Sequence, residues 1–181
     1  MDIIKLCLDS GAEKAEELSV NKLILMPELR ELCKQNLCGM YGRNYACPPS
    51  VGEIDELIAK LKEFNTVVIF QNIYMLEDSF DFEGMMESQA NHDSITRRIA
   101  NELYKKYGRE NVLVLGAGAC SLCEKCGIQT NEICRNPDIM LSSLEAYGIN
   151  VSKIEEISNM KYINGIDTVT YFSGIFYNLP D

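Results

Sequence analysis

The chain has 181 residues, a formal net charge of −10, 46% hydrophobic residues and 24% charged residues. These values suit one globular domain with its own core, and the negative charge argues against nucleic-acid binding, because phosphate contacts need a surplus of lysine and arginine. No apolar run reaches the length of a membrane span, and the chain begins without the basic and apolar segments of a secretory signal. We therefore expect a cytoplasmic protein that binds no nucleic acid and no membrane.

The first third of the chain contains short elements separated by turns. Apolar residues at helical spacing predict a helix over residues 2–10, and a weak β pattern follows over residues 15–20. A proline then predicts a helical turn over residues 27–34. Residues 36–49 are rich in glycine, asparagine and proline and have no apolar period, which predicts a loop.

The middle of the chain carries the strongest patterns. Ser50 and Glu53 have the spacing of a capping box, and the helix expected after it has an apolar stripe of Ile54, Leu57, Ile58, Leu61 and Phe64. Further elements are predicted as a strand over 66–75, a loop over 77–83, a long helix over 85–107 and a strand over 111–115. A helix from Pro137 to Gly148, a short turn over 152–155 and a strand over 168–177 complete the predicted set.

The order strand, long helix, strand across residues 66–115 is typical of a βαβ unit. We therefore predict an α/β fold with a mixed β-sheet flanked by helices. No repeat and no linker interrupts the sequence, so residues 1–181 are predicted to form a single compact cysteine-rich domain.

Seven of the eight cysteines fall into two groups. The upstream group is Cys33, Cys38 and Cys47, and the downstream group is Cys120, Cys123, Cys126 and Cys134. Clustered cysteines in a reducing compartment favour metal binding over disulfides. All seven are therefore candidate metal ligands.

The downstream spacing favours an iron–sulfur cluster over zinc. Three cysteines at successive two-residue gaps followed by a distant fourth is the arrangement of the bacterial ferredoxin run, whereas four-cysteine zinc sites usually come as two separated pairs. The small residues 116–119 are expected to bring backbone N–H groups close to sulfur. We predict one or two [4Fe–4S] clusters, with a zinc-stabilised interaction protein as the weaker alternative.

Seven thiolates cannot complete two four-cysteine clusters. Cys7 lies on an apolar stripe and His92 on a helix face, so both are expected to be structural, although either is an alternative ligand. Cys134 has a second alternative, because the fourth cysteine of such a run serves the other cluster in two-cluster ferredoxins. We expect instead that one iron keeps a vacant or non-cysteine position, open to a small ligand.

Three segments together resemble a known family: Cys38-Gly-Met-Tyr-Gly-Arg-Asn-Tyr-Ala-Cys47-Pro-Pro, Cys120-x2-Cys123-x2-Cys126-x7-Cys134-Arg-x-Pro, and Leu144-Glu-Ala-Tyr-Gly-Ile-Asn-Val151. The family is domain of unknown function 2284, small predicted metal-binding proteins of anaerobic bacteria and methanogens, and the resemblance covers roughly residues 20–178. It implies an iron–sulfur protein of anaerobic metabolism and no particular activity. Ser142-Ser143 stands where we expect Pro-Ser in relatives, a departure that touches no expected ligand.

Two functions follow from these patterns. The first is an electron-transfer module that meets a redox partner protein. The second is a small enzyme whose open iron binds a sulfur- or oxygen-bearing substrate, with Tyr41, Arg43, Tyr45 and Glu124 as nearby polar side chains. The cysteine pattern of radical enzymes is absent from the sequence, and no pattern indicates the oligomeric state.

Overall fold

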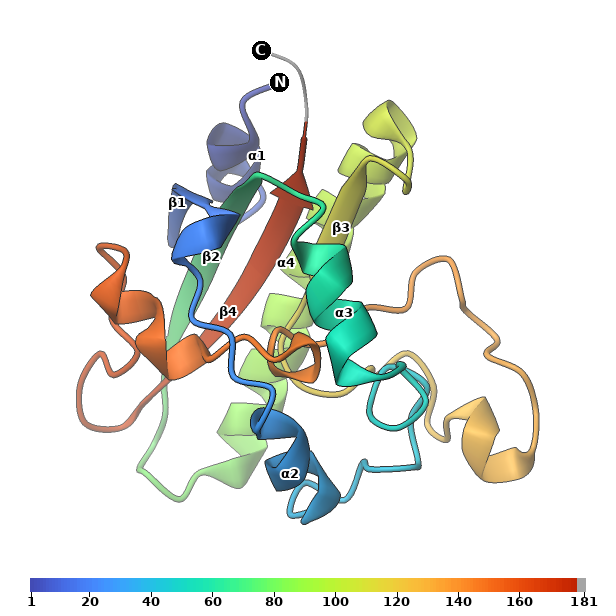
Figure 1. Cartoon of the computed structure of the whole chain (residues 1–181). Helices are drawn as coiled ribbons and strands as arrows, with labels where there is room; N and C mark the ends of the chain where they lie inside the picture. Colours follow the sequence, from blue (N-terminus) through green and yellow to red (C-terminus); the bar gives the residue numbers. More distant parts are fainter. Residues whose placement is uncertain (179–181) are drawn as a thin grey trace.

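A four-stranded antiparallel sheet forms the centre of the molecule, as the computed structural model of residues 1–178 shows (Figure 1). The strands are β1 (Lys14–Ser19), β2 (Thr66–Met75), β3 (Val112–Leu115) and β4 (Thr168–Tyr177), in the spatial order β1-β2-β4-β3. The two long strands β2 and β4 pair along their whole length, from Thr66 opposite Tyr177 to Met75 opposite Thr168. The short strands β1 and β3 form the two edges.

Within residues 1–178, four α-helices and four 3₁₀ helices accompany the sheet. The α-helices are α1 (Ile3–Asp9), α2 (Leu29–Lys34), α3 (Ile54–Leu61) and α4 (Phe82–Tyr107). The 3₁₀ helices are η1 (Val20–Lys22), η2 (Gly127–Thr130), η3 (Glu145–Tyr147) and η4 (Val151–Glu156). Among the described residues, none of these helices combines the length and the apolar character that crossing a membrane requires.

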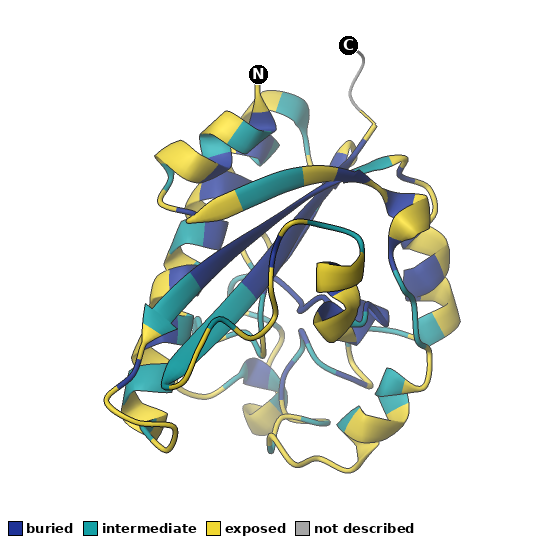
Figure 2. Cartoon of the chain, turned by 90° about the vertical axis from the view of Figure 1, so that its left-hand side faces the viewer, coloured by how far each residue is buried: buried dark blue, intermediate teal, exposed yellow. Residues whose placement is uncertain are grey.

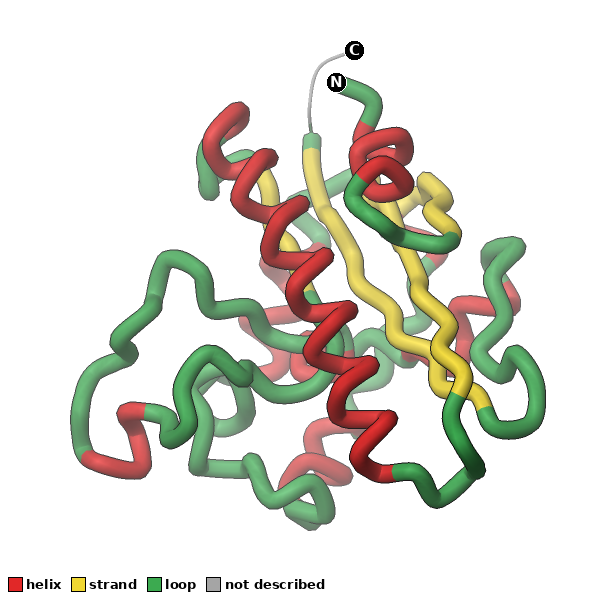
Figure 3. The backbone as a smooth tube through the Cα atoms, turned by 180° about the vertical axis from the view of Figure 1, so that it is seen from behind, coloured by secondary structure: helices red, strands yellow, loops and turns green. Residues whose placement is uncertain are grey.

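Helices cover both faces of the sheet, so the core has two halves. α1 and α4 pack on one face, where Figure 3 shows α4 running across the strands, and α3 with η3 and η4 packs on the other. Alternate residues of β2 serve the two halves: Val67 and Ile69 contribute to the α3 side, Val68 and Phe70 to the α4 side. In Figure 2 the central strands are buried over most of their length, whereas the loops around them are largely exposed.

The predicted α/β class and the single compact domain are confirmed. The sheet differs in one respect from the expected mixed sheet, because all its ladders are antiparallel. β2 and β3 do run in the same direction with α4 between them in sequence, as a βαβ unit requires. However, β4 lies between the two strands and pairs antiparallel with each.

Two local predictions were wrong. The residue that precedes α3 is Glu53, and its side chain makes no capping hydrogen bond, so Ser50 does not form a capping box. No α-helix forms between Pro137 and Gly148 either. The chain extends there toward the edge of β3, and only the 3₁₀ helix η3 forms before the left-handed Gly148.

Candidate metal centre

The upstream cysteines lie on α2 and the loop that follows it. Arg30 holds α2 against the body of the protein, because its guanidinium donates to the carbonyl oxygens of Gly52 at 3.0 Å and Ala146 at 3.2 Å. Cys33 lies on this helix, while Cys38 and Cys47 lie on the predicted loop. The same arginine lowers the pKa of Cys33, but burial of the thiol has the larger effect and raises it.

The downstream cysteines lie on a long loop, residues 117–140, that leaves the sheet at the end of the edge strand β3. The N–H of Gly116 donates to the carbonyl of Ser142 at 2.8 Å, and Leu144 donates back to Gly116 at 3.1 Å. Both ends of residues 117–140 are therefore tied to the end of β3. Only Gly127 is buried within this segment, whose one regular element is η2. Loops of this length with so little core of their own are usually functional.

All four downstream cysteines line one small cavity of about 20 Å³, together with Asn44, Leu122, Gly127, Arg135, Asn136 and Met140. Cys134 thus lies with its own sequence group. None of the four thiols is fully buried. Four thiols around one cavity form a donor set that suits a soft, thiophilic metal.

The two cysteine-bearing loops contact each other directly. Asn44 donates to the carbonyl of Cys120 at 2.8 Å, and the N–H of Tyr45 donates to Cys126 Sγ at 3.4 Å. The Tyr45 hydroxyl donates to the carbonyl of Glu132 at 2.8 Å. Residues 43–45 of the upstream loop therefore dock onto the downstream loop, beside its cysteines.

Cys47 lies where the two groups meet. Burial, together with the smaller effect of the charges of Cys38, Cys33, Cys120 and Cys126, raises the pKa of its thiol to about 12. These four thiols come from both groups, so the fold brings together cysteines that are far apart in sequence. Without a cation nearby, the Cys47 thiol therefore resists ionisation.

Side-chain donors approach two of the downstream sulfurs. Asn136 Nδ2 donates to Cys123 Sγ at 3.4 Å, and Arg97 Nη2 lies 3.9 Å from Cys120 Sγ. The sequence marks neither donor: Asn136 is an unassigned position after Cys134, and Arg97 lies in the middle of α4 with no pattern around it. A backbone N–H, that of Tyr45, donates to Cys126 Sγ. Donation from residues 116–119 to the sulfides of a cluster stays a prediction.

A larger cavity of about 440 Å³ opens onto three of the downstream cysteines, Cys120, Cys123 and Cys126. The other lining residues are Met40, Asn44, Met86, Gln89, Ala90, Ala119, Ser121, Glu124 and Gln129. Of the four polar residues named from sequence, Glu124 therefore lines this cavity. Arg43 lies beside it, since its guanidinium donates to Gln129 at 3.2 Å.

Cys7 and His92 lie outside the centre. Cys7 is fully buried in the core between α1 and the sheet, where burial raises the pKa of its thiol to about 12. His92 is also fully buried, and its two ring nitrogens lie 2.9 Å from Asn72 Oδ1 and 2.8 Å from the Ser173 hydroxyl. The prediction that both are structural agrees with this geometry.

A family model described as a predicted metal-binding protein, domain of unknown function 2284, matches residues 16–177. The chain belongs to this family. No curated protein and no solved structure matches the chain significantly. Within residues 1–178, no three histidine, cysteine, aspartate or glutamate side chains are placed closely enough to hold a single metal ion.

Replacing Gly127 by alanine is expected to damage the centre without touching a cysteine. A methyl group there would lie 2.6 Å from the carbonyl oxygen of Ile133 and 2.7 Å from that of Glu132. Because these are backbone atoms, a change of side-chain rotamer cannot relieve the clash. We expect a loss of about 1–3 kcal/mol in unfolding free energy and a lower metal content. The matched control is Gly116→Ala, where the nearest atom would lie 3.9 Å away. Equal metal content in the two purified variants would contradict this role of Gly127.

Proposed function

We propose that this protein carries an iron–sulfur centre, and that Cys120, Cys123, Cys126 and Cys134 hold a [4Fe–4S] cluster used in electron transfer. The observation that carries the proposal is that these four thiols line one cavity within a loop that has almost no core of its own. Such a loop needs a bound group to organise it, because few apolar contacts oppose its conformational entropy.

The residues around the cavity fit such a cluster. Iron–sulfur clusters are ligated by cysteine thiolates and tuned by hydrogen bonds to sulfur. Tyr45, Asn136 and Arg97 each direct a donor at one of the downstream sulfurs. When bound, the cluster supplies one-electron chemistry. These donors stabilise negative charge on the thiolates and hold the ligands in position.

The upstream group is proposed to hold a second cluster with one iron open. Its three thiols leave one position without a cysteine, and Cys7 and His92 are both enclosed in the core. The open position would accept a small sulfur- or oxygen-bearing ligand.

The cavity of about 440 Å³ favours a second candidate, a small cluster-dependent enzyme. Its volume falls within the usual range of small-molecule sites, and it gives a ligand access to Cys120, Cys123 and Cys126. A pure electron carrier needs only contact with a redox partner protein. Spectra that change when small thiols or sulfide are added would show an open iron, which the enzyme requires and the carrier tolerates, whereas spectra indifferent to them would leave only the carrier.

Protein purified without oxygen is expected to be brown and to contain iron and acid-labile sulfide. Absorption near ~400 nm should bleach on reduction, because cysteine-ligated iron gives thiolate-to-iron charge transfer. Metal and sulfide analysis with electron paramagnetic resonance provides the measurement. Colourless protein with stoichiometric zinc and no sulfide would overturn the proposal in favour of a zinc-stabilised interaction protein.

A further inference from the structure

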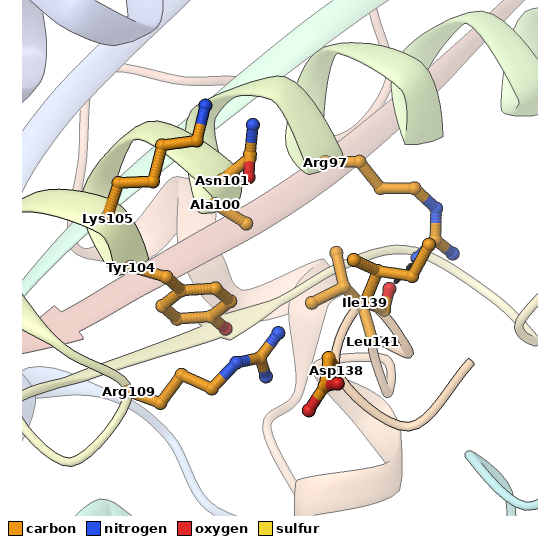
Figure 4. A pocket seen from close by; sticks show the side chains of 9 residues that line it. All are labelled: Arg97, Ala100, Asn101, Tyr104, Lys105, Arg109, Asp138, Ile139 and Leu141. Atoms are coloured by element: carbon orange, nitrogen blue, oxygen red, sulfur yellow. Dashed lines mark hydrogen bonds between the residues drawn. The ribbon is translucent and has the colours of Figure 1, made fainter.

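A third cavity, of about 240 Å³, lies between α4 and residues 138–141 (Figure 4). Its lining residues are Arg97, Ala100, Asn101, Tyr104, Lys105, Arg109, Asp138, Ile139 and Leu141. One wall belongs to α4, and the opposite wall is the stretch through which the cysteine loop returns to the sheet. The cavity is thus next to the metal centre but contains no cysteine.

The cavity gathers positive charge in a chain whose net charge is −10. Arg97 is already paired with Asp93 at 3.0 Å. Among residues 1–178, Arg109 has no carboxylate within 4.0 Å, and its guanidinium lies over the Tyr104 ring at 4.2 Å from the ring centre. An arginine held in place by an aromatic ring and free of an acidic partner is well suited to bind an anion.

The rest of the lining is largely apolar. Ala100 is 3% exposed and Leu141 is 5% exposed, and the Tyr104 ring adds an aromatic surface. Burial raises the pKa of Tyr104, so its hydroxyl stays protonated at neutral pH and can donate a hydrogen bond. The volume lies just below the usual range for ligand sites, about 300–1,000 Å³, which suits a small metabolite.

Figure 4 shows how these groups are arranged. Tyr104 and Arg109 lie on one side of the cavity, Arg97 and Ile139 on the other, and Asp138 lies at its lower edge. The side chains of Lys105 and Asn101 point away from the space between them. Asp138 is the single acidic residue of the lining, and it is exposed.

We propose that this cavity binds a small organic anion, a carboxylate or phosphate carried on an apolar or aromatic body, with Arg109 as its charge partner. Ala100, Leu141 and the Tyr104 ring form an apolar floor that contacts the body of the ligand, and the Arg109 guanidinium binds its charged end. Neither the family assignment nor the metal centre implies such a site, and it does not depend on the iron–sulfur function.

Arg97 joins this cavity to the cysteines. Its guanidinium lines the cavity, donates to the carbonyl of Ile139 and lies 3.9 Å from Cys120 Sγ. An anion in the cavity would reduce the positive charge that Arg97 presents to that sulfur. Anion binding is therefore expected to change the reactivity or the spectrum of the downstream cysteine centre.

Benzoate is a suitable probe, with benzyl alcohol as the uncharged analogue, benzylamine as the cationic one and inorganic phosphate as the anion without an apolar body. Titration of the protein as purified without oxygen, followed by amide NMR shifts, should give a benzoate dissociation constant on the order of 1 mM or tighter. Arg109→Gln should weaken binding by about tenfold or more. The control, Lys106→Gln, removes the same charge from an exposed residue outside the cavity and should bind as the unmodified protein does.

Asp138→Asn tests the sign of the ligand's charge, since it should tighten the binding of an anion. Tighter binding of benzylamine than of benzoate, or no binding of benzoate, would overturn the proposal. If Arg109→Gln and Lys106→Gln lost equal benzoate affinity, the assigned site would be wrong. If inorganic phosphate bound as tightly as benzoate, the apolar floor would have no role in binding. Iron content should be unchanged in Arg109→Gln, so failure here is distinguishable from failure of the iron–sulfur proposal.

Discussion

Replacing Cys123 by alanine is expected to remove the metal from the downstream group and to unfold much of residues 117–140. Cys123 lies with three other thiols around one cavity, in a segment where only Gly127 is buried. In small metal-dependent domains the metal supplies on the order of 10 kcal/mol of folding free energy. Losing a ligand should therefore have a larger effect than most core substitutions.

Metal content, sulfide content and thermal unfolding of Cys123→Ala should all be compared with those of Cys7→Ala. Cys7 is the matched control because it is the one cysteine enclosed in the core between α1 and the sheet. Removing its sulfur leaves a small cavity and should cost about 1–2 kcal/mol, with the metal content unchanged. If Cys7→Ala lost as much iron as Cys123→Ala, the assignment of the ligands would be wrong.

Two strands could be predicted from sequence with their ends. Residues 66–75 and 168–177 are rich in β-branched and aromatic residues, and both form strands over those bounds. The central position of β4 could not be predicted, because strand order depends on pairing between distant segments. A sequence pattern indicates that a strand forms but not which strand lies beside it.

The predicted helix after Pro137 failed for a physical reason. A proline marks where a helix can begin, and a single turn does form, in which the N–H of Met140 donates to the carbonyl of Asn136. Beyond that turn, residues 142–144 pair with Gly116 at the end of β3 instead. The parallel bridge between Gly116 and Ser143 and the two hydrogen bonds beside it fix that stretch in an extended form. Tertiary pairing here outweighed a local start signal.

The two cysteine groups could be predicted from their spacing, but the contact between the two loops that carry them could not. Asn44 and Cys120 are far apart in sequence, and no local pattern indicates that the side chain of one binds the backbone of the other. The same holds for Arg97, which reaches Cys120 from the middle of α4. Contacts of this kind follow from how whole elements pack, so only the fold reveals them.

The buried polar network around His92 is also invisible in the sequence. Asn72 Nδ2 donates to the carbonyl of Gly11 at 2.8 Å, so its Oδ1 faces His92 and Nδ1 of the ring carries the proton. The other nitrogen accepts from Ser173, whose hydroxyl lies 2.9 Å from that of Thr96. Serine, histidine and asparagine lie in the order of a catalytic triad, yet Ser173 and His92 are fully buried and no substrate can reach them.

Because of this network, the folded protein is expected to lose stability at acidic pH. Burial lowers the pKa of His92 from 6.5 to about 4, so the unfolded chain takes up its proton at a higher pH than the folded protein does. The contribution of the neutral His92 to the free energy of unfolding is complete above pH ~6.5 and is lost as the pH falls toward ~4. Each pKa unit corresponds to about 1.4 kcal/mol, so the loss should reach about 3 kcal/mol.

The comparison of the unmodified protein with His92→Gln isolates this contribution, since the carboxylates that titrate in the same range are common to both proteins. Urea unfolding at a series of pH values should show the unmodified protein losing about 3 kcal/mol more than the variant between pH ~6.5 and ~4. The variant should be the less stable of the two at neutral pH, because glutamine cannot meet both Asn72 and Ser173 with the geometry of the ring. Parallel pH profiles would mean that His92 is protonated in the folded protein as readily as in the unfolded chain, and that its burial does not set the acid limit of this fold.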